Sequence, residues 1–276
     1  MSPLKTPFLS IAIAVFLLQL FSFPLKSQDF PPDAPISKIY NTTSPRAGIK
    51  GEYFFQQNSC VFYSMDYNFN PNHRYWITNA TRINNTIGLE MNASNRWYIG
   101  GSISHRLSYV KNQNLATAKV NFSHRGNIKS IQFIKELSYE YIHHFNDPFY
   151  ITQKDFQTGM AAGLYKTFQL FKRPLGIFPS YKAILNSGLQ FDIYKNRKID
   201  FTRLRLDVFY GITDNVYIGV FAMKETEYYT YSSSGGNPPV NIYFRINNIK
   251  PVIGLNLNIV LNADKIENYI PGLPFR

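Results

Sequence analysis

The dominant pattern in this chain is an alternation of apolar and polar residues with a period of two. In the run 60–69, for example, Val61, Tyr63, Met65 and Tyr67 share one face. This spacing puts apolar side chains on one side of an extended strand and polar ones on the other. Helical spacing is nearly absent from there onward, so the sequence predicts an all-β fold.

Ten alternating runs follow one another and predict an antiparallel up-and-down β-barrel of about ten strands. Short polar connections tend to alternate with longer ones, such as 143–155 and 232–239, which is typical of barrels that cross an outer membrane. The count becomes twelve if residues 48–55 add a strand and residues 247–250 form a turn. The expected strands are 59–69, 75–92, 96–111, 115–124, 128–143, 156–171, 177–194, 200–212, 215–231 and 240–262.

The last run contains a change of phase. Its apolar residues occupy even positions up to Ile246 and odd positions from Ile253. A bulge near Pro251 would keep 240–262 as one strand, whereas a turn at 247–250 would divide it. With one bulged strand, both ends of the barrel lie on the side of the short turns.

The N-terminus predicts export. Lys5 precedes the apolar stretch 8–23, and a small residue, Ser27, precedes Gln28, as in a secretory signal peptide. An uncleaved membrane anchor is the alternative. We therefore divide the chain into a signal peptide (1–27), a Pro-rich periplasmic segment (28–58), a β-barrel (59–262) and a C-terminal tail (263–276).

The composition of the polar face favours a membrane barrel over a soluble one. After the signal peptide no stretch is long and apolar enough for a membrane helix, so a membrane form of the mature chain requires a closed barrel. The polar face is rich in Gly, Ser, Asn and Thr, which suits a narrow lumen better than a soluble surface. A secreted lipocalin-like, lipid-binding barrel is the alternative.

The stretch RLRLDVFYGITDNVYIGVF (203–221), together with the signal peptide and the alternating array, resembles small outer-membrane β-barrel proteins of Bacteroidota-type Gram-negative bacteria. The resemblance implies an outer-membrane location, contact with lipid and lipopolysaccharide, and assembly by the barrel-assembly machinery. Many such barrels end on an aromatic residue within the last strand. Here ADKIENYIPGLPFR (263–276) follows that strand, so it is either an appendage or an extension of the strand.

Charge and cysteine content narrow the function classes further. The chain carries 29 Lys and Arg against 17 Asp and Glu, a formal net charge of +12. The basic residues are scattered and form no run, so we expect an anionic membrane surface, and no nucleic acid, as the partner. Cys60 is the only cysteine, which excludes a disulfide scaffold, and no cluster with ligand spacing indicates a metal or another cofactor.

Two possible enzyme sites are weak. His143 and His144 near Asp147 are the closest approach to the acidic and histidine pairs of a barrel protease. A lipid A deacylase needs His and Ser on one face of a strand, and His105 and Ser108, three apart, point to opposite faces. We assign no catalytic residue and expect no enzyme, with a lipid-modifying barrel enzyme as the alternative.

The strongest candidate site is a set of charged residues on the polar face of the strands. Paired with one another, they would fill the lumen and stabilise it, because an isolated buried charge is costly. Alternatively, they line a narrow solute path in which Arg203 and Arg205 favour anions. The set is Arg106, Lys119, Glu136, Glu140, Lys182, Asp192, Arg203, Arg205, Asp207, Glu225 and Arg245.

Overall fold

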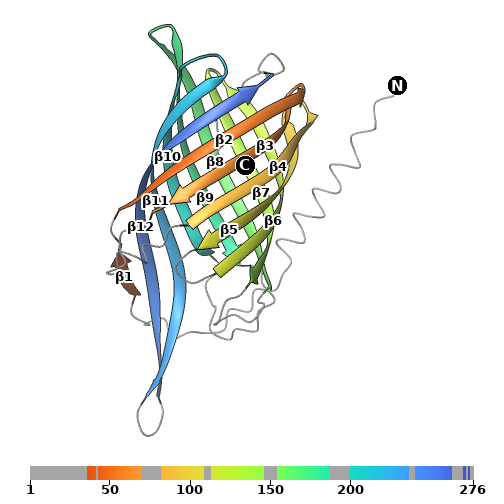
Figure 1. Cartoon of the computed structure of the whole chain (residues 1–276). Coiled ribbons are helices and arrows are strands. Elements are labelled where there is room, and N and C mark those ends of the chain that lie inside the picture. The colour runs from red at the N-terminus through yellow and green to blue at the C-terminus, as the bar shows by residue number, and fades with distance from the viewer. Residues whose placement is uncertain are drawn as a thin grey trace. The chain divides into compact units, whose positions relative to one another are not determined.

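The chain forms a closed β-barrel (Figure 1). It divides into two units, residues 1–34 and 35–276. The computed structural model describes residues 36–41, 43–69, 82–108, 113–145, 154–186, 199–235, 240–262, 270, 271 and 273, all in the second unit. The expected signal peptide lies outside the described residues.

Eleven strands, β2 to β12, make up the barrel wall, and β1 is added beside β12. All neighbours from β2 to β12 along the chain pair antiparallel, so the expected all-β fold is confirmed. The strands are β1 (Ile36–Tyr40), β2 (Ser44–Gln56), β3 (Ser59–Asn68), β4 (Arg82–Ser94), β5 (Trp97–Ser108), β6 (Gln113–Ile128), β7 (Ile131–Phe145), β8 (Lys154–Leu170), β9 (Arg173–Asn186), β10 (Ile199–Gly211), β11 (Val216–Gly235) and β12 (Val240–Leu261).

The barrel closes through a parallel pair. β2 runs beside β12 from Ser44, opposite Val252, to Tyr53, opposite Leu261. An odd number of strands requires such a parallel seam, because the first and last strands then point the same way. The barrel therefore starts at the end with long connections and finishes at the end with short turns. The expectation that both ends of the barrel lie on the short-turn side is wrong.

β2 lies within residues 28–58, which were expected to precede the barrel. Ile49, Tyr53 and Phe55 are exposed on its outer face, but two glycines and a proline make its alternation hard to see in the sequence. The wall therefore begins at Ser44 rather than at residue 59. This added strand explains why the count is eleven and not ten.

β12 is continuous through residues 247–250. Its pairing with β11 runs without a register shift from Ile259 to Val240, so it contains neither the expected bulge nor the turn. The reason for the change of phase is position. Residues 252–261 pair with β2 in the wall, whereas residues 245–249 pair with β1. In Figure 1 this part of the β11–β12 hairpin extends beyond the other strands, where no lumen dictates the alternation.

The five short turns all lie at one end of the barrel. They join β2 to β3, β4 to β5, β6 to β7, β8 to β9 and β10 to β11, with two to four residues each. Asn58, Lys129, Phe171 and Lys172 take positive φ values in these turns, as tight hairpins require. The turn expected at 124–127 is at 129–130, because β6 continues to Ile128.

The outer surface of the wall is apolar. Large hydrophobic side chains alternate with inward-facing residues and are exposed on every strand from β2 to β12. This belt is far more extensive than the isolated apolar patches on a soluble monomer. Examples, one for each strand, are Ile49, Tyr63, Ile87, Ile103, Val120, Tyr139, Met160, Tyr181, Leu204, Val220 and Leu255.

The short-turn half of the lumen is filled by aromatic rings that lie over glycines of neighbouring strands. Phe209 of β10 covers Gly219 of β11, where an added Cβ would lie 2.6 Å from the ring. Phe62 covers Gly88 in the same manner, and both rings are buried. The small residues on the inner face therefore make room for large luminal rings.

Candidate functional site: the charged lumen

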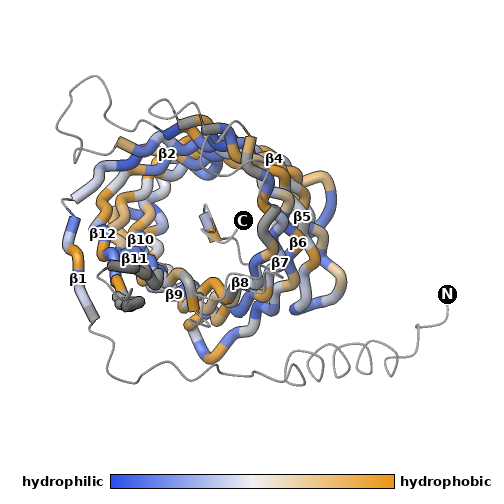
Figure 2. Tube along the Cα trace, turned by 90° about the horizontal axis from the view of Figure 1, so that it is seen from below, coloured by the Kyte–Doolittle hydropathy of each residue, from blue (hydrophilic) through white to orange (hydrophobic). Residues whose placement is uncertain are grey.

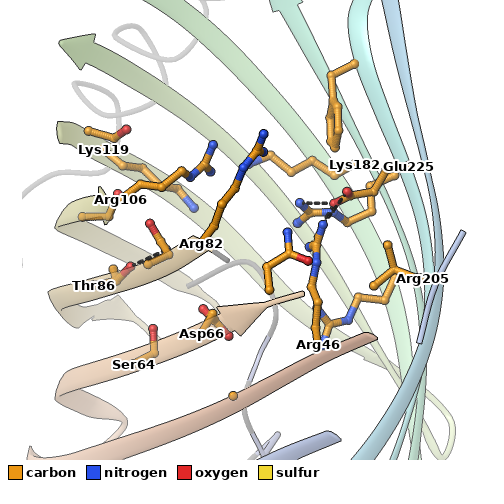
Figure 3. A pocket seen from close by; sticks show the side chains of 18 of the residues that line it. Arg46, Ser64, Asp66, Arg82, Thr86, Arg106, Lys119, Lys182, Arg205 and Glu225 are labelled. Carbon is orange, nitrogen blue, oxygen red and sulfur yellow. Dashed lines mark hydrogen bonds and ion pairs between the residues drawn. The ribbon is translucent and has the colours of Figure 1, made fainter. Parts of the chain in front are cut away.

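The other half of the lumen is a cavity of about 610 Å³ with a strongly charged wall (Figure 3). Inward-facing residues of nearly all the wall strands line it, since every second residue of a wall strand points inward. Cationic side chains outnumber carboxylates by nine to four. The cations are Arg46, Lys50, Arg82, Arg106, Lys119, Lys182, Arg203, Arg205 and Lys250, and the acids are Asp66, Glu140, Glu225 and Glu227.

Glu225 of β11 is shared by two arginines. Arg46 of β2 donates from Nη2 to Oε2 at 2.7 Å, and Arg203 of β10 donates from Nη2 to Oε1, also at 2.7 Å. Arg203 is expected beside Glu225, because the two residues are directly opposite in the β10–β11 pair. Arg46 reaches the same carboxylate across β12, the one strand that lies between β2 and β11, so one negative charge serves two positive ones.

Arg205 is held more locally. It donates to Asp207, two residues along the same face of β10, with Nη2 2.6 Å from Oδ1 and Nε 2.8 Å from Oδ2. Its guanidinium also lies 4.0 Å from the centroid of the Phe221 ring, a cation–π distance. Asp207 is fully buried behind it. Arg205 is therefore anchored to the wall.

Two lysine–glutamate pairs continue the charged network along β6 to β9, where Lys182 lies directly opposite Arg203 of β10. Lys119 of β6 donates to Glu136 of β7 at 2.7 Å, and Lys182 of β9 donates to Glu140 at 2.9 Å. Lys119 and Glu136 lie on neighbouring strands, whereas β8 lies between Lys182 and Glu140. Of the site predicted from sequence, these four residues, the two arginines 203 and 205, Asp207 and Glu225 are thus joined in ion pairs.

Arg82 and Arg106 have no acidic partner among the described residues. Arg106 of β5 lies opposite Asn84, so Arg82 of β4 is its diagonal neighbour on the inner face. Both side chains reach into the cavity in Figure 3. The charged groups that act most strongly on Arg106 are the guanidiniums of Arg82, Arg46 and Arg203. This part of the cavity is therefore a concentration of positive charge.

Several site residues were not predicted. Arg82 follows the same alternation as its strand and could have been found from it. Arg46 and Lys50 belong to the segment that was expected to precede the barrel. Asp192 and the side chain of Arg245, both predicted for the site, lie outside the described residues.

The C-terminal tail enters the lumen. Ile270 and Leu273 are buried against the inward-facing Ile134, Tyr165 and Phe178 at the short-turn end. In Figure 2 this short described piece of the chain lies inside the ring of strands. Lys50 donates from Nζ to the carbonyl oxygen of Leu273 at 3.3 Å. The tail is therefore neither a strand extension nor an external appendage at these residues.

The possible catalytic residues are not brought together by the described structure. His143 lies in β7 rather than in a loop, with its ring 4.2 Å from that of Phe145. Asp147 and the side chains of His144 and Ser108 lie outside the described residues. No group of three or more His, Cys, Asp or Glu within the described ranges is arranged to hold a metal ion. No described helix is long and apolar enough to cross a membrane.

Comparison with known proteins gives little further information. No family model matches the chain, and no curated protein is significantly similar to it. Among solved structures, the NanC porin, determined in a rhombohedral crystal form, is similar over 67% of this chain and 87% of its own. The two share 12% identity with a TM-score of 0.37, so the likeness supports no functional argument.

Proposed function

We propose that this protein is an outer-membrane β-barrel whose lumen is a narrow path for small solutes, with a preference for anions. The apolar belt around all eleven wall strands supports the membrane setting, since such a surface is stable in lipid and not in water. Export by the N-terminal signal peptide and contact with lipopolysaccharide belong to the same proposal.

The observation that carries the anion preference is the excess of cations in the cavity. Three further carboxylates, Glu52, Glu136 and Asp207, do not line the cavity but pair with cations that do. The cations still outnumber the carboxylates when these three are added to the four lining acids. A narrow, low-dielectric passage lined by one sign of charge concentrates ions of the opposite sign. No catalytic arrangement is proposed, and the role is passage or structural support rather than enzymatic.

The test is the reversal potential of the purified barrel in a planar bilayer under a potassium chloride gradient. Wild-type protein is expected to pass chloride more readily than potassium. The variant Arg82→Gln with Arg106→Gln should lose much of this preference. The matched control, Lys135→Gln with Lys166→Gln, removes two positive charges from the outer face of the wall and should leave it unchanged. Equal selectivity in all three proteins would refute the proposal.

A further inference from the structure

We propose that Arg82 and Arg106 form a binding site for a small solute that carries an oxyanion, such as a phosphate, sulfate or carboxylate group. This inference rests on the proposed function and deepens it, because it identifies where an anion binds within the same cavity. It starts from an energetic imbalance. Two guanidiniums on neighbouring strands face one cavity with no described carboxylate to neutralise them.

The surroundings make the charge excess local. Glu225 is already bound by Arg46 and Arg203, and Asp207 is bound by Arg205. Asp66, the remaining lining acid nearby, lies on β3 opposite Asn84, so it is two strands from Arg106 but a diagonal neighbour of Arg82. The cations that act most strongly on Asp66 are Arg205, Lys50, Arg46 and Arg203, so its charge is directed to them rather than to the Arg82–Arg106 pair.

Arginine is suited to this ligand class. Its planar guanidinium offers a fork of N–H donors that matches the paired oxygens of a carboxylate, sulfate or phosphate. Hydroxyl groups of Ser102, Ser104 and Thr117 line the same cavity and supply neutral donors beside the arginines. A bound oxyanion would also remove the repulsion between the two cations.

The test is isothermal titration calorimetry of the folded full-length barrel in a neutral detergent without lipid, with inorganic phosphate and sodium sulfate as separate probes. Without lipid, no lipid headgroup can be the occupant. Arg82→Gln with Arg106→Gln should weaken binding at least about tenfold, because charge-assisted hydrogen bonds are lost. Lys135→Gln with Lys166→Gln should bind as wild type does.

Absence of phosphate and sulfate binding to wild type, or unchanged affinity in the arginine variant, would overturn the site. Calorimetry needs no ion current, so the proposed binding site and the proposed channel can each be refuted without the other. Binding without conductance would retain the site and reject the channel, and selectivity without binding would do the reverse.

We infer, from their buried position, that Ile270 and Leu273 plug the short-turn end of the lumen. Ile270 and Leu273 fit among luminal aromatic rings and are almost inaccessible to solvent, at 4% and 1% exposure. Leu273 also lines the floor of the charged cavity. The tail thus lies between the cavity and the short-turn mouth.

The plug is attached by contacts that can be broken without damaging the wall. Among the described tail residues, Ile270 and Leu273 contribute apolar side chains and the Leu273 carbonyl accepts a hydrogen bond from Lys50, while the wall is held by its own strand pairing. Lys50 also pairs with Glu52, 3.4 Å away, so the lysine stays in place when the tail leaves. Passage through the barrel therefore depends on displacing the tail.

Accessibility to a thiol reagent tests the position of the tail. In a Cys60→Ser background, Leu273→Cys should react with a charged maleimide far more slowly in the folded barrel than after denaturation. Adding Ile270→Asp should release the tail and speed the reaction. Equally fast labelling of folded and denatured protein would overturn the plug.

Single-channel recording then tests its effect. Ile270→Asp with Leu273→Asp should raise the conductance severalfold over wild type, with heat-modifiable gel mobility showing that the barrel is folded. Unchanged conductance in a folded variant whose tail is accessible would overturn closure by the tail. If position 273 is protected from the maleimide and neither wild type nor the variant conducts, the proposed channel is rejected, whereas the buried position of the tail is retained.

Discussion

The ring of Phe221 occupies the space in which a side chain on Gly254 would stand. The two residues are directly opposite in the β11–β12 pair, and the ring lies across the glycine on the luminal face. The same arrangement joins Phe209 to Gly219 and Phe62 to Gly88. In each of these pairs the missing side chain of the glycine leaves room for the aromatic ring on the luminal face.

Replacement of the glycine in such a pair should destabilise the barrel. Gly254→Val places a side chain against both the Phe221 ring and the backbone carbonyl oxygen of Arg46, and should lower the free energy of unfolding by about 1–3 kcal/mol, as overpacking does in other interiors. The measurement is urea unfolding in detergent or vesicles, followed by heat-modifiable gel mobility. Gly51→Val is the control, because nothing lies within 4 Å of a Cβ at Gly51. Equal loss of stability in both variants would show that strand propensity, and not the ring, is responsible.

Removal of the shared carboxylate should have two effects. Glu225→Gln keeps the shape of the side chain but leaves Arg46 and Arg203 without their counter-ion. We expect a loss of about 1–3 kcal/mol in unfolding free energy and a stronger anion preference in bilayer recordings. Asp214→Asn is the control, since Asp214 is 96% exposed in its pair with Arg173. A weaker anion preference would contradict the arrangement.

The paired arginines and the unpaired ones should behave differently. Arg203→Ala with Arg205→Ala takes from the buried Asp207 its arginine partner and from Glu225 one of its two arginines, so thermal stability should fall clearly. Arg82→Gln with Arg106→Gln removes charges that have no described acid partner and should lower stability little or raise it. Thermal melting of heat-modifiable mobility measures both. The reverse order of stabilities would mean that the ion pairs are placed incorrectly.

The apolar belt can be tested by inserting a charge. Val220, half exposed on the outer face of β11, should tolerate arginine poorly in a bilayer. We expect Val220→Arg to cost about 2–4 kcal/mol near mid-membrane, measured by reversible folding into lipid vesicles. Asn95→Arg, in a short turn, should cost little. If Val220→Arg were harmless in vesicles, the outer face would not contact lipid.

Much of the wall could be predicted because alternation is a local property. Val61, Tyr63 and Met65 of β3 are apolar and face outward, whereas Ser64 and Asp66, which alternate with them, line the charged cavity. All ten expected strands are present in the structure, with ends that differ by a few residues within the described ranges; the expected parts 75–81 and 187–194 lie outside the described residues.

The rest depends on contacts between distant parts of the chain. Nothing near Arg46 reveals that it will meet Glu225, 179 residues later, because that contact exists only once the barrel is closed. Likewise, nothing in the local sequence of the tail shows that Ile270 and Leu273 will be buried, because only the lumen of the finished barrel provides a place for them. The parallel seam of β2 and β12 is equally invisible in either strand alone.

That seam has a consequence for orientation. In the proposed outer-membrane setting, a wall of eleven strands takes the chain across the membrane an odd number of times, so the barrel starts at Ser44 on one side and finishes at Leu261 on the other. A single epitope ahead of β1 and another in the first residues after β12 would then report opposite sides of the same envelope. In that setting the orientation of the barrel can be determined from its two ends alone, without labelling any loop.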